Sequence, residues 1–339
     1  MNIKYVENKK IDYSLIESLL KRSENVNLYT NGGPVKRLLE LKLEKLLELP
    51  ANKKVICVCN GTSALKCLIF LYEKNIGKSL KWITNSFTFP SVVVNNNNTI
   101  IVDIDLNSYS FKPDNESFDG VILTNLFGTK VKDIEFWVDY CEKNGKILIS
   151  DNASSPLTMH NNVNICAVGD SSFGSLHHTK YLGFGEGGFV VVDEKDVDDI
   201  NSITNFGFKS NREYHSLSSN YKMSDISASF ILQHIENYDI NKHIELQKLL
   251  VNKIRYIGLD VFNYDRDVVL GNIPVLFKNQ MSVEYFRDKG VEANKYYLPL
   301  KEHENSYHLY DRIINLPLNQ TLDEFQIDYM LKALKESKK

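Results

Sequence analysis

The sequence predicts an α/β protein with a mostly parallel central sheet and a smaller α/β domain at its carboxyl end. Short apolar runs typical of buried strands alternate with amphipathic helical segments through the first two-thirds of the chain. This alternation indicates parallel strands joined by crossover helices. Beyond about residue 236 the pattern changes to a long helix, shorter strand candidates and a last helix. We therefore expect a large domain over residues 1–235 and a smaller one over residues 236–339.

The spacing of apolar residues predicts where the helices and strands lie. In the first helix, Val35, Leu39, Leu43 and Leu47 share one face. In chain order the large domain is predicted to hold a helix at 35–48, a strand at 55–59, a helix from 60, a strand at 81–84, a helix from Pro90, strands at 99–105 and 121–126, a helix at 131–144 and a strand at 146–151. The smaller domain is predicted to hold a long helix over 234–255, a strand within 267–277 and a helix at 323–336.

Composition excludes several classes of function. The 40 basic and 43 acidic residues give a net charge of −3, so no general attraction to nucleic acid or anionic membrane is expected. No apolar run approaches the roughly 20 residues that span a bilayer, and the first residues lack the apolar core of a secretion signal. Five cysteines without such a signal indicate free thiols, and Cys57 and Cys59 lie in a strand pattern, so no metal is predicted. A cytoplasmic enzyme is the expectation.

A first candidate site is the turn Asn60-Gly61-Thr62-Ser63, which follows a predicted strand and opens a helix. The free amides and the dipole at a helix start favour a phosphate group, and the hydroxyls of Thr62 and Ser63 add donors. Alone, this turn is a weak signal, because Asn-Gly-Thr-Ser is also typical of an ordinary turn and helix start.

Two further residues carry chemistry. Asp151 ends an apolar strand, where a carboxylate either caps the next turn or faces a ligand. Lys180 lies between two histidines and the glycines at 183, 185, 187 and 188. A lysine in a crowded, dry site loses its proton readily and acts as a nucleophilic amine, although a surface lysine in a glycine loop gives the same pattern.

Together the turn, the acid and the lysine describe a pyridoxal phosphate site. The lysine would form the Schiff base, the carboxylate would face the pyridine nitrogen, and the turn would hold the phosphate. A carboxylate about 4 Å from a protonated ring nitrogen contributes roughly 4 kcal/mol at an effective dielectric near 20. That interaction corresponds to about three pKa units, enough to keep the ring protonated.

The order of short motifs resembles the DegT/StrS-type sugar aminotransferases, a family of fold-type I pyridoxal phosphate enzymes with a three-layer, aspartate aminotransferase-like fold. The motifs are Thr30-Asn31-Gly32-Gly33-Pro34 followed by Glu40, NGTSAL at 60–65, SFTF at 86–89, VDID at 102–105, NLFGT at 125–129, SDNAS at 150–154, Ser175 five residues before Lys180, GEGG at 185–188, SNYKMSDISAS at 219–229 and NLPL at 315–318.

The resemblance implies a role for each matching residue. Lys180 becomes the cofactor-linked lysine and proton carrier, and Asp151 the partner of the pyridine nitrogen. Phe89 matches the aromatic side chain that stacks on the ring. The phosphate ligands of the family match Gly61, Thr62, Ser63 and Ser175, together with Asn220 supplied by the partner subunit of a homodimer.

Two positions depart from the family pattern. Ser154 stands where the family has glutamine, histidine or glutamate beside the cofactor hydroxyl, and Lys222 replaces an arginine, which keeps the charge and loses the planar fork. A related dehydratase branch carries histidine at the position of Lys180, so the lysine favours amination. Candidate substrate contacts are His177 and His178 beside the sugar, with Lys209, Arg212 and Lys222 for the diphosphate. A packing or solvated-loop role is open for each.

The resemblance implies transfer of an amino group from L-glutamate to a nucleotide-linked 3- or 4-keto-6-deoxyhexose, such as a dTDP-sugar, for an amino sugar of a surface glycan such as lipopolysaccharide O-antigen. Two alternatives stay open. One is another fold-type I reaction on a small amino acid; a desulfurase would need a mobile catalytic cysteine, and the five here lie in apolar contexts. The other is a catalytically silent regulator that binds the cofactor.

Overall fold

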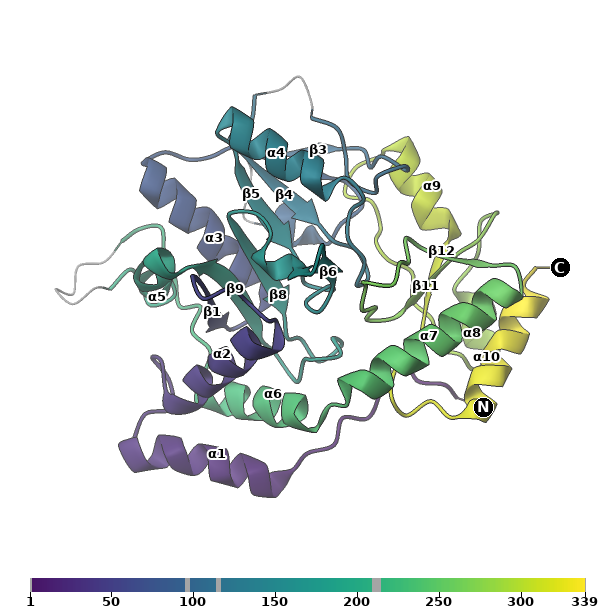
Figure 1. Ribbon diagram of the computed structural model, residues 1–339, viewed down its shortest axis with the longest axis horizontal. Helices are drawn as coiled ribbons and strands as arrows, with labels where there is room; N and C mark the ends of the chain where they lie inside the picture. The colour runs from purple at the N-terminus through teal and green to yellow at the C-terminus, as the bar shows by residue number, and fades with distance from the viewer. Residues whose placement is uncertain (1, 95–97, 114–116, 209–214, 339) are drawn as a thin grey trace.

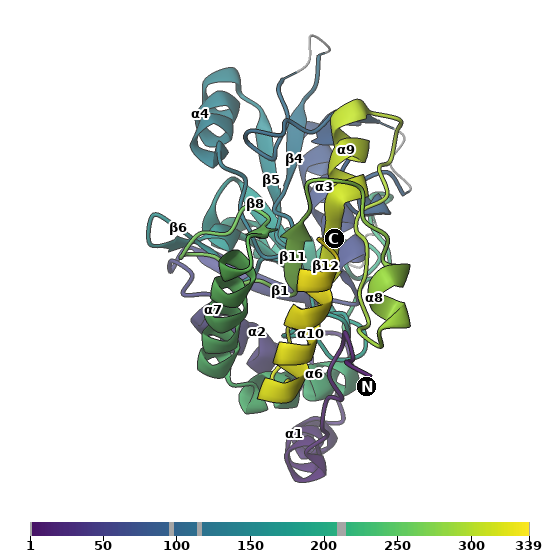
Figure 2. The same ribbon diagram turned by 90° about the vertical axis from the view of Figure 1, so that its right-hand side faces the viewer.

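The computed structural model describes residues 2–94, 98–113, 117–208 and 215–338. It has a large α/β part and a smaller part beside it, to which both chain ends belong (Figures 1 and 2). The helices are α1 (Tyr13–Val26), α2 (Pro34–Leu46), α3 (Gly61–Ile76), α4 (Ile134–Asn144), α5 (Val197–Ile203), α6 (Asp225–Asn237), α7 (Ile240–Tyr256), α8 (Glu284–Asp288), α9 (Glu304–Arg312) and α10 (Glu324–Glu336). The strands are β1 (Lys53–Val58), β2 (Trp82–Asn85), β3 (Thr99–Val102), β4 (Gly120–Thr124), β5 (Ile147–Asp151), β6 (Met159–His160), β7 (Val163–Asn164), β8 (Ser171–Ser175), β9 (Gly188–Asp193), β10 (Asp260–Val261), β11 (Ile273–Leu276) and β12 (Ile313–Leu316).

The large sheet has seven strands in the order β1-β9-β8-β5-β4-β2-β3. Every neighbouring pair is parallel except the two that involve β9, which runs antiparallel to both β1 and β8. The predicted mostly parallel sheet is therefore confirmed. Since β1 runs in the same direction as the parallel strands, its carboxyl end lies at the same edge of the sheet as those of β4, β5 and β8.

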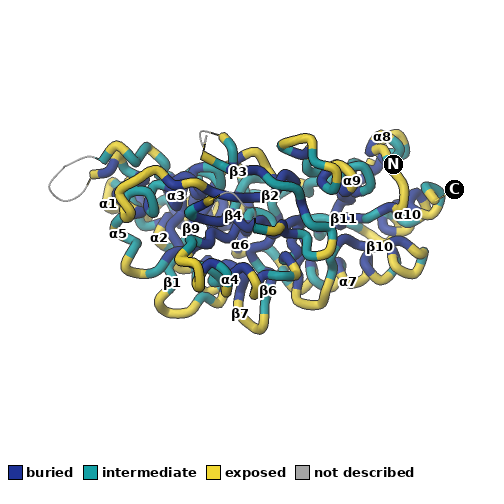
Figure 3. Tube along the Cα trace, turned by 90° about the horizontal axis from the view of Figure 1, so that it is seen from above, coloured by how far each residue is buried: buried dark blue, intermediate teal, exposed yellow. Residues whose placement is uncertain are grey.

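Helices cover both faces of this sheet, which gives three layers. Alternate residues of β1 point to opposite faces: Val55 and Cys57 pack with α2 and α6, whereas Ile56 and Val58 pack with α3 and α5. A strand buried on both faces reads as a continuous apolar run, which is why the sequence predicted it. The central strands are accordingly dark blue in Figure 3, with exposed residues confined to the outside.

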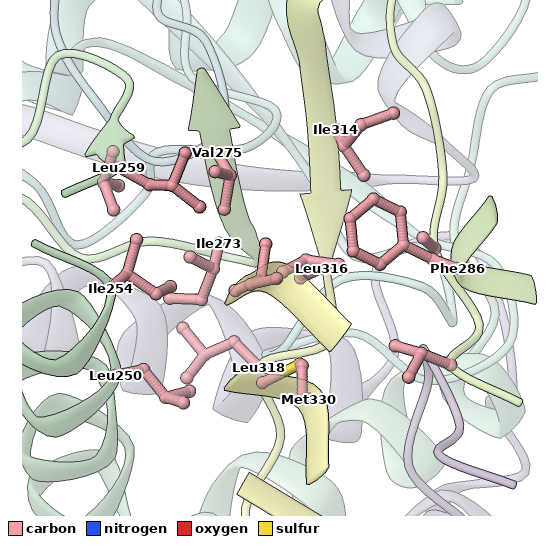
Figure 4. Close-up of a cluster of buried hydrophobic side chains, with 14 of the residues drawn as sticks. Leu250, Ile254, Leu259, Ile273, Val275, Phe286, Ile314, Leu316, Leu318 and Met330 are labelled. Atoms are coloured by element: carbon pink, nitrogen blue, oxygen red, sulfur yellow. The ribbon is translucent and has the colours of Figure 1, made fainter. Parts of the chain in front are cut away.

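A second sheet, β10-β11-β12, is antiparallel and carries its own apolar core. Leu250 and Ile254 of α7 and Met330 of α10 pack on its strands (Figure 4). The start of the chain joins this core, since the amide of Ile3 donates to the carbonyl of Gly290 at 2.8 Å. We propose on this basis that residues 236–339 form a separate small domain that also receives the first residues of the chain.

Two predicted helices differ in the structure. The helix expected from Pro90 is only a 3₁₀ turn, Pro90–Val92. The valines at 92–94 restrict side-chain rotation in a helix, and Val92 is buried against the core around α3. The long helix expected over 234–255 is two helices. Asp239 starts the second by accepting a hydrogen bond from the amide of Lys242 at 3.0 Å, a capping geometry that favours a new helix start.

Within the described ranges, no helix is long and apolar enough to cross a membrane. The same residues contain no group of three or more histidine, cysteine, aspartate or glutamate side chains placed to hold a metal ion.

Candidate active site

A cavity of about 630 Å³ lies at the carboxyl edge of the large sheet. The ends of β4, β5 and β8 contribute Thr124, Asp151 and Ser175, and the turn after β1 contributes Gly61. A crevice at the carboxyl ends of parallel strands is the usual ligand position in such sheets. The small domain and the first residues of the chain close it with Tyr5, Asn272, Tyr296 and Tyr297.

The turn after β1 has the features of an anion site. The side chain of Asn60 accepts from the amide of Ser63 at 2.8 Å and so starts α3. The amides of Gly61 and Thr62 come first in the helix and have no helical carbonyl to bond to, so they can donate to an anion. Gly188 allows β9 to begin against this turn, because a Cβ there would lie 2.3 Å from the carbonyl carbon of Asn60.

Asp151 is a buried acid at the end of β5. It accepts a hydrogen bond from the amide of Ala153 at 3.0 Å, and it also bonds to the side chain of Thr124. Burial raises the pKa of Asp151 to about 6, and the nearby Lys180 opposes that rise. A carboxyl group buried this deeply gains strongly from a cationic partner, which the protonated nitrogen of a pyridine ring supplies.

Lys180 follows β8 in the loop that leads to β9. Its amine donates to the hydroxyl of Ser154 at 2.8 Å. Burial lowers the pKa of Lys180 to about 8, while the charge of Asp151 opposes the change. A lysine with this pKa exchanges a proton readily near neutral pH. Ser154, the residue that departs from the family pattern, therefore contacts the lysine directly.

An aromatic wall faces these polar groups. The ring of Phe89 is half exposed and meets the ring of Tyr297 edge-on, with centroids 6.3 Å apart. The hydroxyl of Tyr297 bonds to the side chain of Ser154. Tyr5, Tyr296 and Tyr297 were not predicted as site residues, since they come from irregular segments with no recognisable motif. Thr124 was also missed, although its place at a strand end could have identified it.

Of the remaining predicted site residues, some line the cavity and others do not. His177 lines the cavity, and its Nε2 atom is 3.5 Å from a carboxylate oxygen of Glu186. The ring of His178 instead packs edge-on against Phe184, and the side chain is not part of the cavity wall. Asn220 also lies outside the wall and pairs through its backbone with Asn205. Lys209 and Arg212 lie outside the described residues.

Lys222 faces a second cavity of about 720 Å³, which Lys36 and Arg37 also line. Its amine donates to the side chain of Asn205 at 2.7 Å and lies 4.7 Å from the ring centre of Phe206. Lys222 is thus separate from the cavity that holds Lys180 of the same chain.

The residues of the first cavity fit pyridoxal phosphate. The first amides of α3 can bind a phosphate, and the buried carboxyl group of Asp151 can pair with a cation. Lys180, whose pKa is lowered, interacts with the charge of Asp151 and bonds to Ser154. The model of the DegT/DnrJ/EryC1/StrS aminotransferase family matches residues 12–335. The chain belongs to this family. It is therefore a pyridoxal phosphate-dependent enzyme of the sugar aminotransferase family, as the sequence predicted.

Curated relatives and solved structures agree with that membership. The chain is 22% identical to the dTDP-4-amino-4,6-dideoxy-D-glucose transaminase of Shigella dysenteriae, over 91% of this chain and 92% of that protein. Its fold matches Helicobacter pylori PseC, an aminotransferase of pseudoaminic acid biosynthesis, with a TM-score of 0.83, 16% identity and 99% of each chain covered. It matches DesI, solved with its TDP-sugar product, with a TM-score of 0.84, 19% identity and coverage of 99% and 92%.

Proposed function

We propose that this aminotransferase moves the amino group of L-glutamate to the keto carbon of a nucleotide-diphosphate-linked keto-deoxyhexose. The observation that carries the proposal is the position of the Lys180 amine, 2.8 Å from Ser154 in a cavity that also holds Asp151 and the anion-binding turn. When bound there, pyridoxal phosphate accepts the amino group from the donor and passes it to the keto-sugar.

The protein holds and polarises this cofactor. The amides of Gly61 and Thr62 would form the phosphate site with the hydroxyls of Thr62 and Ser63 and of Ser175, which lies beside Gly61. Asp151 would pair with the ring nitrogen, and Phe89 would cover one face of the ring. Lys180 would then remain free to exchange a proton with the substrate.

Lys180 carries the proton. In the first half of the reaction its neutral amine would take the proton from Cα of glutamate; the bound cofactor would retain the amino group, and water would supply the keto oxygen of 2-oxoglutarate. In the second half the same amine works in reverse on the sugar carbon. A pKa of about 8 keeps both protonation states accessible near neutral pH, which a general acid–base group requires. Ser154 accepts a hydrogen bond from this amine and so holds it in place.

A keto-sugar nucleotide is the substrate class that the relatives support. The Shigella dysenteriae relative is named for a dTDP-linked amino-dideoxyglucose, and DesI was solved with a TDP-sugar. His177, at the cavity wall, is a candidate contact for the sugar, and Lys209, Arg212 and Lys222 are candidate contacts for the diphosphate. Since the SpsC protein of Bacillus subtilis, 22% identical, is a spore coat polysaccharide biosynthesis protein, we also propose an amino sugar of a surface glycan as the product.

The site is proposed to be shared between two copies of the chain in the cytoplasm. Asn220 and Lys222 do not line the cavity of their own chain, although Tyr221 between them does, so we propose that they serve the cavity of a partner. Phe206 and Phe208, close by in sequence, leave 46% and 45% of their surface exposed. Large exposed aromatic side chains beside polar groups are typical of protein interfaces.

Reconstitution tests this function. Purified chain incubated with pyridoxal phosphate should gain a visible absorption band that borohydride fixes to Lys180 and that Lys180→Ala abolishes. Glutamate should bleach the band and release 2-oxoglutarate, and dTDP-, UDP- and GDP-linked keto-sugars then identify the acceptor. A bound cofactor that glutamate leaves unchanged would indicate a regulator instead. A chain that binds no cofactor would contradict the proposal.

A further inference from the structure

The loop that carries Lys180 is held at its base by its own backbone. The amide of Leu176 donates to the carbonyl of Gly187 at 2.8 Å, and the amide of His178 donates to the carbonyl of Gly185 at 2.7 Å. Further along the loop, the amide of Lys180 donates to the carbonyl of His177 at 2.8 Å, and the amide of Gly183 donates to the carbonyl of Lys180 at 3.0 Å. Side-chain donors that bond to the carbonyls of this segment add to these backbone bonds and help to fix the Lys180 main chain.

Two basic side chains from distant parts of the chain, the partly buried Lys9 and the buried His234, bond to carbonyls at the far end of the loop. The amine of Lys9 donates to the carbonyl of Lys180 at 2.6 Å and also to the carbonyl of Gly183. The Nε2 atom of His234, in α6, lies 2.8 Å from the carbonyl of Tyr181. Because a carbonyl oxygen only accepts, Nε2 of His234 carries the hydrogen.

The charges of these groups suit the role. Burial lowers the pKa of His234 to about 4, so the ring is neutral at neutral pH and donates from one nitrogen. Burial lowers the pKa of Lys9 to about 8, so its amine is mostly charged at neutral pH and makes charge-assisted bonds to two carbonyls. Neither side chain belongs to the cavity wall formed by the described residues, so neither contacts the reacting groups.

We propose that Lys9 and His234 are positioning residues, which act by fixing the main-chain carbonyls at residues 180, 181 and 183 so that the Lys180 amine stays between Asp151 and Ser154. The inference rests on the proposed catalytic role of Lys180. Lys9 lies between Ile3, which bonds to the small domain, and α1, which contacts α6 of the large domain. The start of the chain thus links the small domain to the loop of the catalytic lysine.

The test uses the cofactor-free full chain, so its result does not depend on cofactor binding or turnover. Lys9→Met removes the donor, Lys9→Arg keeps it, and Lys10→Met is the matched control at an exposed neighbour. Hydrogen exchange is measured for the amides of residues 176–188, with α4 as an internal reference. Trinitrobenzenesulfonate labelling of Lys180, followed by peptide mapping across pH, reports its pKa.

We expect exchange in the loop to accelerate about tenfold in Lys9→Met, with α4 unchanged. The labelling midpoint of Lys180 should rise by about one pH unit, because a looser loop admits water around the amine. Lys9→Arg and Lys10→Met should match the wild type in both measurements. In the loaded enzyme, the rate of the glutamate half-reaction should fall about tenfold in Lys9→Met.

His234 provides an independent second test. His234→Phe removes the donor to the Tyr181 carbonyl and should act like Lys9→Met, whereas His234→Gln keeps a donor and should restore loop exchange. If Lys9→Met fails to fold, the comparison of His234→Phe with His234→Gln still tests the proposal. Folded Lys9→Met or His234→Phe protein with wild-type loop exchange and an unchanged labelling midpoint would overturn the proposal. A wild-type chain that binds no cofactor would contradict the proposed function and leave this test valid.

Discussion

The amine of Lys180 donates a hydrogen bond of 2.8 Å to the hydroxyl of Ser154, the residue that departs from the usual pattern of the family. Tyr297, from the small domain, bonds to the same serine side chain. Ser154 therefore connects Lys180, the proposed catalytic lysine, with the aromatic wall. A short side chain at this position keeps a polar contact by bonding to the lysine itself.

Removing the hydroxyl of Ser154 should slow the reaction without unfolding the protein. Ser154→Ala loses one hydrogen bond to the Lys180 amine, worth about 1 kcal/mol, so the glutamate half-reaction should slow about fivefold. Ser154→Thr keeps the hydroxyl and serves as the control. Stopped-flow measurement of the bleaching of the cofactor band checks this. Equal rates for the alanine variant and the wild type would show that the contact does not matter.

Asp151 should destabilise the cofactor-free chain above pH 6. Its pKa is raised from 3.8 to about 6 in the folded state, so between these values the folded chain binds more protons than the unfolded chain and loses stability as pH rises. Asp151→Asn should therefore raise the free energy of unfolding by up to about 3 kcal/mol at pH 7. Urea unfolding at pH 7 and pH 4 measures the difference.

The effect should disappear near pH 4, where the carboxyl group is protonated in the folded state. With pyridoxal phosphate bound the sign should reverse, because Asp151 then has a cationic partner that asparagine cannot replace. An asparagine variant that is less stable than the wild type without cofactor at pH 7 would contradict this account of the burial of Asp151.

Gly188→Ala should weaken cofactor binding through the phosphate turn. The added Cβ would lie 2.3 Å from the carbonyl carbon of Asn60, so the turn that presents the amides of Gly61 and Thr62 must shift. We expect the dissociation constant of pyridoxal phosphate to rise at least about tenfold, the equivalent of roughly 1.4 kcal/mol. Fluorescence titration of the cofactor measures it.

Gly77→Ala is the matched control at the opposite end of α3. Gly77 has a φ of +78° and no atom within 4 Å of an added Cβ, so alanine there strains the backbone without moving the turn. It should lower stability and leave cofactor affinity unchanged. Equal loss of affinity in both variants would point to a general loss of the fold.

Subunit mixing should test the shared site. Asn220→Ala and Lys180→Ala are each expected to be inactive or strongly impaired alone. In a mixed dimer, one site combines the intact Lys180 of one chain with the intact Asn220 of the other. Random exchange should therefore restore about one quarter of wild-type activity, as a two-fold symmetric dimer requires. Activity that stays at the level of the separate variants would contradict a site shared through Asn220.

The sequence was informative where local chemistry and position coincide. Asp151 ends a strand of strong apolar pattern and Gly61 opens a helix directly after another, so the topology of a parallel sheet brings them to one edge. Lys180 was identified by its glycine-rich surroundings and its place in the family pattern. The structure gathers all three around one cavity.

The rest depends on contacts that no local pattern records. Tyr5 reaches the cavity and Lys9 reaches the loop of Lys180 from the start of the chain, where Ile3 pairs with Val291, nearly the whole chain away in sequence. Tyr297 comes from an irregular segment of the small domain. The break between α6 and α7 was missed because apolar spacing continues across it. The extended backbone at Tyr238 and the capping by Asp239 separate the two helices.

The most direct test of the account is one reaction with purified, reconstituted chain. L-glutamate labelled with ¹⁵N is incubated with dTDP-4-keto-6-deoxyglucose, and the sugar nucleotide and 2-oxoglutarate are measured by mass spectrometry. We predict equal amounts of ¹⁵N-amino sugar nucleotide and 2-oxoglutarate, and neither product with Lys180→Ala. Two results would contradict the account. One is a chain that binds the cofactor through Lys180 but forms no 2-oxoglutarate, and the other is such a chain that forms no amino sugar from any dTDP-, UDP- or GDP-linked keto-sugar.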